Sequence, residues 1–263
     1  MRLRLRITGA VQGVGFRPHV FRLATEAQLA GFVLNSPQGV QIEVQGPGES
    51  VEAFREKLQQ NPPANAQIAT FTSEQIPDQP DQTFEVRPSA NTGQPAAYLL
   101  PDLAICPPCL ADIRNPRNRR HLYPFTSCTH CGPRYSIVEA LPYDRPLTAM
   151  RHFPLCPACH QEYTNPQDRR FHAQTNCCPA CGPQLELRTL SGTQAVKHEA
   201  LQQAAQAIRE GRILALKGIG GFHLICDARN KAAIETLRHR KRRPTKPFAV
   251  MFPHHPEPLL YTP

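Results

Sequence analysis

The sequence lacks tryptophan, has only three methionines among 263 residues, and contains no long apolar run. A membrane-spanning helix needs about 20 consecutive apolar residues, so we expect no membrane contact. The N-terminus alternates arginine with leucine or isoleucine and has neither the apolar core nor the small-residue cleavage site of a secretory signal. We therefore expect a cytoplasmic protein, in which cysteines stay reduced and can bind metal.

Acidic residues are also scarce relative to basic ones, and this gives a net charge of +9. Such a charge attracts phosphate groups, whether on small molecules or on nucleic acid. Proline is abundant, at 28 residues, and much of it lies between residues 88 and 183. This stretch is therefore expected to form short turns rather than long regular elements.

Eight of the ten cysteines form four Cys-x-x-Cys pairs, which are separated by 18, 24 and 18 residues. The stretch repeats itself without gaps at an offset of 50, so that Asn-Pro recurs at 115 and 165 and Arg-Arg at 119 and 169. Zinc takes four thiolates in a tetrahedron, and two close pairs supply them. The pattern predicts two structural zinc ions held by Cys106, Cys109, Cys128, Cys131, Cys156, Cys159, Cys178 and Cys181.

The spacing leaves several alternatives open for this module. The pairs could close sequentially, first with second and third with fourth, or nested, first with fourth and second with third. Cys177 is predicted to be a spare, and disulfides or redox-active thiols are the weaker alternatives. The spacing also resembles the cysteine-rich region of a chaperone family. Any nearby histidine could replace a cysteine ligand, namely His121, His130, His152, His160 or His172.

Two roles are open for the same module. Its basic pairs, Arg119-Arg120 and Arg169-Arg170, could contact the phosphates of a nucleic acid. Alternatively, the metal supplies the folding energy that a proline-rich segment lacks, and the module holds its neighbours in place.

Residues 1–88 alternate strand and helix patterns in the order β-α-β-β-α-β, which predicts a ferredoxin-like fold. The first strand reads as half-buried, with Leu3, Leu5 and Ile7 on the core face and arginines between them. We expect helices that begin near Pro18 and near Ser50, the latter as N-cap. The remaining strands are expected at 32–35, 40–44, 67–76 and 83–86.

A glycine-rich loop, with Gly9, Gly13 and Gly15, joins the first strand to the first helix. Glycines let successive N–H groups turn inward, and such a nest at a helix N-terminus binds an anion. Arg17 follows, and its fork could hold two phosphate oxygens. A glycine-rich turn beside a surface arginine would give the same pattern.

The residues Val-Gln-Gly-Val-Gly-Phe-Arg17, Gly31-Phe-Val-Leu-Asn35 and Gly39-Val-Gln-Ile-Glu-Val-Gln-Gly46 resemble acylphosphatase across residues 3–88. The resemblance implies that Arg17 and Asn35 are catalytic: Arg17 clamps the phosphate and Asn35 orients a water. It also implies a phosphate-binding loop made of Gln12, Gly13, Val14, Gly15, Phe16 and Arg17. Catalysis of this kind is positioning and charge stabilisation without a metal.

Residues 198–263 show helix, strand, glycine loop, strand and helix patterns, followed by a basic cluster at 238–243 that could be a solvated face or a polyphosphate clamp. The segments 217–224 and 241–250 resemble the opening of a YrdC-type domain, which binds ATP. The implied nucleotide- and carbamate-binding residues are Lys217, Gly218, Gly220, Lys241, Arg243 and Lys246. Only an opening part of such an α/β domain is present, so we expect a truncated chain.

The parts together predict an α+β multidomain protein: an acylphosphatase-like domain (1–88), a linker (89–104), a double zinc-finger module (105–189) and an incomplete α/β YrdC-like domain (198–263). This order resembles the HypF-type carbamoyltransferases that mature nickel–iron hydrogenases. The family implies carbamoyl phosphate hydrolysis, then activation of the carbamate with ATP, and with Mg²⁺, as carbamoyl-adenylate. The carbamoyl group then passes to the C-terminal cysteine of the partner protein HypE for cyanide ligand synthesis.

We expect this chain alone to keep acyl phosphate hydrolysis and to lose carbamoyl transfer. Two other functions remain open. One is a stand-alone acylphosphatase with a passenger zinc module. The other is a zinc-dependent nucleic-acid binder, which is disfavoured because aromatic-rich strand motifs are missing.

Overall fold

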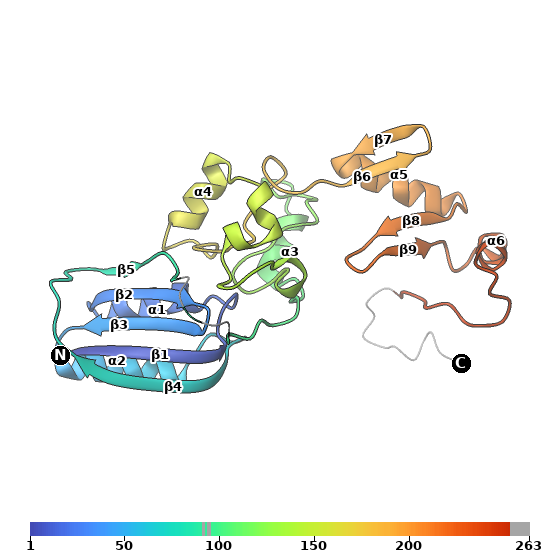
Figure 1. Cartoon of the computed structure of the whole chain (residues 1–263). Helices are drawn as coiled ribbons and strands as arrows, with labels where there is room; N and C mark the ends of the chain where they lie inside the picture. Colours follow the sequence, from blue (N-terminus) through green and yellow to red (C-terminus); the bar gives the residue numbers. More distant parts are fainter. Residues whose placement is uncertain (91–92, 94–95, 253–263) are drawn as a thin grey trace. The chain divides into compact units, whose positions relative to one another are not determined.

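The computed structural model describes residues 1–90, 93 and 96–252 (Figure 1). Parts of the predicted linker 89–104 and of the predicted C-terminal domain, residues 91–92, 94–95 and 253–263, lie outside the described residues. Contacts divide the chain into two compact units, Met1–Pro183 and Gln184–Pro263. The acylphosphatase-like part and the cysteine repeat therefore belong to one unit.

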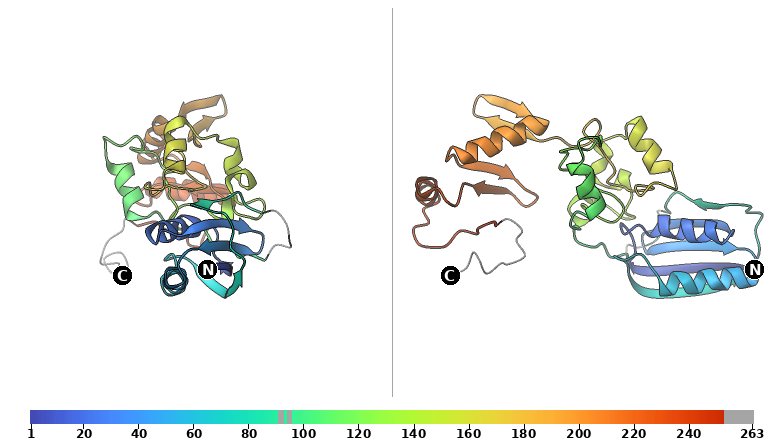
Figure 2. Two further views of the ribbon diagram at one scale, coloured as in Figure 1. Left: turned by 90° about the vertical axis from the view of Figure 1, so that its left-hand side faces the viewer. Right: turned by 180° about the vertical axis from the view of Figure 1, so that it is seen from behind.

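The first unit begins with a five-stranded sheet in the order β4-β1-β3-β2-β5. All neighbours are antiparallel except β2 and β5, which are parallel. Both helices cover one face of this sheet (Figure 1 and Figure 2). The predicted β-α-β-β-α-β order is confirmed by β1 (Arg2–Ala10), α1 (Phe16–Glu26), β2 (Ala30–Ser36), β3 (Gly39–Gln45), α2 (Gly48–Gln60), β4 (Gln67–Ile76) and β5 (Phe84–Val86).

The core of this domain lies between the sheet and the two helices. Leu5 and Ile7 of β1 are buried there with Ile42 of β3 and Leu58 of α2, as strand alternation and helical spacing require. Arg2 departs from the alternation, because it is 1% exposed although the pattern places it on the solvent face. Its guanidinium is paired with Glu43 at 2.8 Å and with Asp81 at 2.7 Å, so distant carboxylates cover this position.

The helix starts differ from the sequence expectation. Helix α1 begins at Phe16, two residues before Pro18, after Gly15 in a left-handed conformation with φ of 77°. Helix α2 begins at Gly48 after Pro47, so the prediction that Ser50 is the N-cap was wrong. Proline fixes φ near −65°, and Pro47 therefore sets the entry to α2 without a side-chain cap.

The cysteine repeat forms two copies of one short fold. Helices α3 (Pro107–Arg114) and α4 (Pro157–Thr164) have eight residues each, and both begin at the proline that follows the first cysteine of a pair. Equivalent residues Leu122 and His172 both have positive φ, at 57° and 53°. The segment between the copies holds three short 3₁₀ helices, η1 (Tyr135–Ile137), η2 (Arg145–Leu147) and η3 (Ala149–His152).

In its described residues, 184–252, the second unit contains two hairpins and two helices. Its elements are β6 (Glu186–Thr189), β7 (Gly192–Val196), α5 (Lys197–Arg209), β8 (Leu214–Lys217), β9 (Phe222–Ile225) and α6 (Lys231–Lys241). Strands β6 and β7 pair with each other, as do β8 and β9. In the described part of the chain, no helix is long and apolar enough to cross a membrane.

Candidate phosphate site and two four-cysteine centres

The glycine-rich loop between β1 and α1 has the backbone shape of an anion site. Gly13 and Gly15 have φ of 70° and 77°, values that favour glycine. The first N–H groups of a helix have no acceptor within the helix, and the helix dipole is positive at that end. Val14 and Phe16 are buried in the core at 0% and 2% exposure, so they anchor the loop on both sides of Gly15.

Arg17 and Asn35 lie side by side next to this loop. Arg17 is 8% exposed and Asn35 is 2% exposed. With its amide oxygen turned toward Arg17, Asn35 accepts from Nε and Nη2 at 3.2 Å each. The structure therefore brings together the two side chains that the sequence predicts to be catalytic.

Gln12, predicted as part of the phosphate loop, holds the loop to its surroundings through its side chain. Its Nε2 donates to the carbonyl oxygens of Ser36 and Gly39, at 2.6 and 3.0 Å. Its Oε1 accepts from the backbone N–H of Tyr143 at 2.8 Å. The β2–β3 hairpin and the segment between the cysteine copies thus meet at one buried side chain.

A cavity of about 30 Å³ lies over the loop and has walls from both parts of the first unit. Gln12, Gly13, Gly15, Arg17 and Asn35 line it from the ferredoxin-like domain. Thr129, Arg134, Tyr143, His172 and Gln174 line it from the cysteine repeat. Sequence reasoning missed this second wall, since no local pattern joins residues more than 90 positions apart.

Arg134 connects the first cysteine centre to the phosphate loop. It is 2% exposed, and its Nε donates to the carbonyl oxygen of Gly13. Its other donors bind the carbonyl oxygens of Cys128, Thr129, Cys131 and Pro133. All five N–H groups of this guanidinium are used, so Arg134 fixes the cysteine turn against the loop.

Replacing Gly13 with alanine should damage the site without touching a reacting group. A Cβ at this position would lie 2.8 Å from Cδ of Arg134, and the φ of 70° disfavours any side chain. We expect Gly13→Ala to lower kcat/KM for acyl phosphate hydrolysis by about 10- to 100-fold, since a displacement of 1 Å can cost that much. Gly48→Ala, where a Cβ meets nothing within 4 Å, is the control. Equal rates for both variants would show that the loop tolerates the shift.

Asp144 lies at the guanidinium of Arg17. Its Oδ1 accepts from Nη2 at 2.7 Å, and the two side chains are 19% and 9% exposed. Its Oδ2 accepts from the hydroxyl of Ser89. The carboxylate thus reaches the predicted phosphate clamp from a proline-rich segment whose sequence predicts only turns.

His172 is the part of this wall whose charge depends on pH. Burial lowers its pKa to about 4, with the positive charge of Arg17 as a second cause. Its Nδ1 is buried without a hydrogen-bond partner. At neutral pH the imidazole is therefore uncharged, and His172 lies at the cavity rather than in either group of four cysteines.

The depressed pKa of His172 predicts an acid-dependent loss of stability. In the unfolded chain the imidazole takes up its proton near pH 6.5, whereas in the folded chain it does so near pH 4. Its contribution to the free energy of unfolding is therefore complete above pH 6.5 and falls as the pH drops toward 4, by at most about 3 kcal/mol. Urea unfolding at pH 7, 6 and 5 with excess zinc should show a shallower pH dependence for His172→Gln. His152→Gln, at an exposed position, should keep the wild-type dependence, and identical slopes for all three proteins would refute the assignment.

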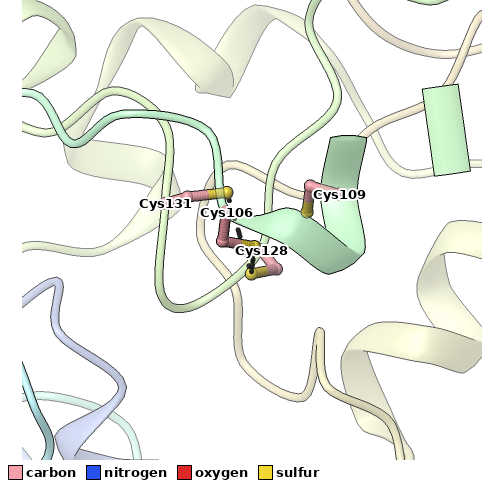
Figure 3. A group of neighbouring side chains, drawn as sticks. All are labelled: Cys106, Cys109, Cys128 and Cys131. Carbon is pink, nitrogen blue, oxygen red and sulfur yellow. Dashed lines mark hydrogen bonds between the residues drawn. The ribbon is translucent and has the colours of Figure 1, made fainter. Parts of the chain in front are cut away.

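The eight predicted ligand cysteines form two separate groups, which settles the pairing by geometry (Figure 3 shows the first group). In each group the four sulfur atoms lie within 4.8 Å of one another. The pairs close sequentially, and neither group of four includes a histidine. Four converging thiols on short turns are the donor set that zinc prefers. The groups are Cys106, Cys109, Cys128 and Cys131, then Cys156, Cys159, Cys178 and Cys181.

Each cysteine group receives an arginine from the opposite copy. Arg169 Nη1 donates to Cys109 Sγ at 3.0 Å, and Arg119 Nη2 donates to Cys159 Sγ at 3.2 Å. The same arginine pairs bind the acidic residue one turn further along the partner helix, Asp112 in one copy and Glu162 in the other. Hydrogen bonds to thiolates offset the negative charge of a four-thiolate centre, so each copy stabilises the four-cysteine group of the other.

These contacts bury one arginine of each pair. Arg120 and Arg170 are 1% and 5% exposed, so neither can reach the phosphates of a nucleic acid. The side chains of Arg119 and Arg169 are 33% and 30% exposed and are paired with Glu162 and Asp112. Cys177, the predicted spare, is also buried and lies near the hydroxyl of Tyr123, at 3.6 Å, outside both groups.

The predicted nucleotide-binding residues lie in the second unit. Lys217 ends β8, with its Nζ 5.3 Å from the ring centroid of Phe222, and Gly218 and Gly220 follow in the β8–β9 loop. Lys241 ends α6, and the guanidinium of Arg243 lies 5.4 Å from the Phe248 ring. The carbonyl of Lys246 accepts from Arg238 at 3.1 Å. Within residues 184–252, no hydrogen bond or ion pair joins the β8–β9 loop to the basic cluster at 238–243.

Known families match the chain in the order of these parts. A model described as acylphosphatase matches residues 3–86, and one described as HypF finger matches 105–138 and 155–188. The Sua5/YciO/YrdC model, described as telomere recombination, matches 206–259.

"Carbamoyltransferase HypF" from Synechocystis sp. is 52% identical over 249 residues, which cover 94% of this chain. The chain belongs to the HypF family. It spans about a third of its curated relatives, 32% of the Synechocystis protein and 31% of "Carbamoyltransferase HypF2" from Cupriavidus necator, which is 48% identical.

HypF structures and acylphosphatases support the same assignment. Full-length HypF in the phosphate- and nucleotide-bound form superposes with a TM-score of 0.85 at 40% identity, covering 94% of this chain and 32% of that one. HypF from T. kodakarensis gives 0.84 at 43% identity, covering 94% and 31%. An acylphosphatase from Syntrophotalea carbinolica is 33% identical over 88 residues, 33% of this chain and 96% of that enzyme. The first domain of this HypF-family chain is thus an acylphosphatase domain.

Proposed function

We propose that this chain hydrolyses acyl phosphates, with carbamoyl phosphate as the substrate, at the loop of residues 12–17. The observation that carries the proposal is the pairing of Arg17 with Asn35 beside a loop in which Gly13 and Gly15 have positive φ. The amides and Arg17 hold the phosphate and offset its charge. Asn35 orients a water molecule, whose attack yields carbamate and inorganic phosphate.

The cysteine repeat is proposed to hold two structural zinc ions. Both groups offer four thiols with the right mutual distances, and the arginines from the opposite copy complete each site. The metal supplies folding energy to a segment with little apolar core. On this proposal the repeat is a rigid wall that encloses the phosphate site, and its cysteines take no part in the reaction.

The later steps are proposed for the full-length family member in the cytoplasm. Residues 198–263 are proposed to open a YrdC-like domain, in which Lys217, Gly218, Gly220, Lys241, Arg243 and Lys246 bind ATP with Mg²⁺ and the carbamate. The carbamoyl group would pass as carbamoyl-adenylate to the C-terminal cysteine of HypE. A relative with bound phosphate and nucleotide supports two such sites in one protein. The chain spans about a third of its relatives, and the hydrolysis is the step that we propose for the residues of its first domain.

Phosphate release from carbamoyl phosphate tests the proposed hydrolysis. We expect the zinc-loaded chain to release phosphate well above the uncatalysed rate, and Asn35→Ala to reduce kcat by about 100-fold, as the loss of one oriented polar group does. Asn61→Ala, at the exposed end of α2, should keep the activity. A folded chain that releases no phosphate, or an Asn35→Ala variant with wild-type kcat, would reject the proposal.

A further inference from the structure

The guanidinium that is proposed to clamp the substrate phosphate is bound to a carboxylate of the same chain. Asp144 Oδ1 lies 2.7 Å from Arg17 Nη2, and its Oδ2 accepts from the Ser89 hydroxyl. Ser89 also accepts from Arg17 Nη1 at 3.4 Å. Arg17, Ser89 and Asp144 therefore form a closed triangle of hydrogen bonds.

The backbone that carries Asp144 is fixed on both sides. Tyr143 is 2% exposed, and its N–H donates to Gln12 at 2.8 Å while its hydroxyl donates to Pro133. Arg145 donates to the carbonyl oxygens of Gln174, at 2.7 Å, and Asn176, at 2.9 Å. The Asp144 side chain can rotate about its own bonds, whereas its Cα is held in place.

A carboxylate and a phosphate group compete for the same donors. Both bind the arginine fork through two oxygens, and two anions placed together on one guanidinium repel each other. Arg17 lines the cavity over the loop. A phosphate held by the loop amides therefore meets the same guanidinium that the Asp144 carboxylate binds.

We propose that the Asp144 carboxylate and the substrate phosphate bind Arg17 in turn. This inference rests on the proposed hydrolysis at Arg17 and Asn35. The incoming phosphate, which also gains the loop amides, displaces the carboxylate from Arg17. After hydrolysis the carboxylate returns and displaces inorganic phosphate. Asp144 is thus a positioning residue that weakens the binding of phosphate, the product, and keeps Arg17 aligned between turnovers.

Binding of inorganic phosphate to the zinc-loaded chain tests this exchange directly. Asp144→Asn keeps an oxygen for Arg17 and removes the negative charge. We expect calorimetry to show phosphate binding at least about tenfold tighter than in the wild type, because a unit charge so close to the anion is lost. Phosphate should also become a stronger competitive inhibitor of acyl phosphate hydrolysis by the same factor, while kcat falls with slower product release.

Two further variants complete the test. Glu139→Gln removes a carboxylate from the same segment, one that is paired with Arg151 on the surface, and should leave phosphate binding unchanged. Ser89→Ala removes the second anchor of Asp144 and should tighten phosphate binding by a smaller factor. It remains informative if Asp144→Asn loses zinc or fails to fold.

The outcomes separate this inference from the proposed hydrolysis. If Asp144→Asn and Ser89→Ala bind phosphate as weakly as the wild type, or more weakly, Asp144 only orients Arg17 and the exchange is refuted. If phosphate binding tightens as expected but no variant, nor the wild type, hydrolyses an acyl phosphate, the proposed function fails and the exchange at Arg17 stands.

Discussion

Replacing Arg17 with alanine is expected to reduce acyl phosphate hydrolysis by about 10³-fold or more, the scale at which a single arginine stabilises charge in phosphoryl chemistry. The side chain is 8% exposed and lies between Asn35 and Asp144. Its removal takes away the cation that faces the phosphate. It also leaves the Asp144 carboxylate without its partner, so phosphate meets repulsion where it met attraction.

Steady-state phosphate release measures the loss, with circular dichroism and zinc content confirming the fold. Arg22→Ala removes the same charge from an exposed position of α1 and should keep the wild-type rate. Arg17→Lys keeps the charge without the fork and should recover only a small part of the activity. An Arg17→Ala protein that is folded and fully active would place the site elsewhere.

Replacing Cys109 with serine is expected to release both zinc ions, although only one group of four contains this residue. Apparent zinc binding in small zinc-finger peptides contributes about 10–16 kcal/mol to folding. Cys109 Sγ also accepts from Arg169 of the other copy, and the Arg119 and Arg120 contacts to Cys159 of the second group come from the first copy. If one copy becomes disordered, its arginines no longer donate to the cysteine sulfurs of the other copy.

Native mass spectrometry and phosphate release together test this coupling. We expect Cys109→Ser to contain no zinc and to lose hydrolysis, because Thr129 and Arg134 would leave the cavity wall. Cys177→Ser, next to a ligand but outside both groups, should retain two zinc ions and the activity. A Cys109→Ser protein that keeps one zinc ion and a folded second copy would show that the two sites are independent.

Local patterns predicted the parts of the site that lie close together in the sequence. The loop residues 12–17 are contiguous, and Asn35 lies on the strand after α1, so glycine chemistry and a family resemblance were enough to place them. The cysteine pairing stayed open, since sequential and nested closure have the same spacing. The structure decides it through the sulfur atoms, which lie within 4.8 Å of one another in each sequential group of four.

The rest of the site depends on contacts between distant residues that carry no local signature. Asp144 meets Arg17 across 127 positions and Arg134 meets Gly13 across 121. Both residues lie in proline-rich sequence, which predicts turns and gives no indication of what the turns contact. The prediction that Arg2 faces solvent was wrong for the same reason. Glu43 and Asp81, which are distant in the sequence, cover a position that strand alternation assigns to solvent.

The two copies of the cysteine fold have the same shape but present different chemistry to the phosphate loop. The first contributes Arg134, whose equivalent at the offset of 50 is Gln184, and the second contributes His172, whose equivalent is Leu122. A single finger could offer only one of these two side chains. The repeat thus gives the phosphate loop a wall with two unlike faces, and on the proposed function the deletion of either copy would leave a bound phosphate open to bulk water.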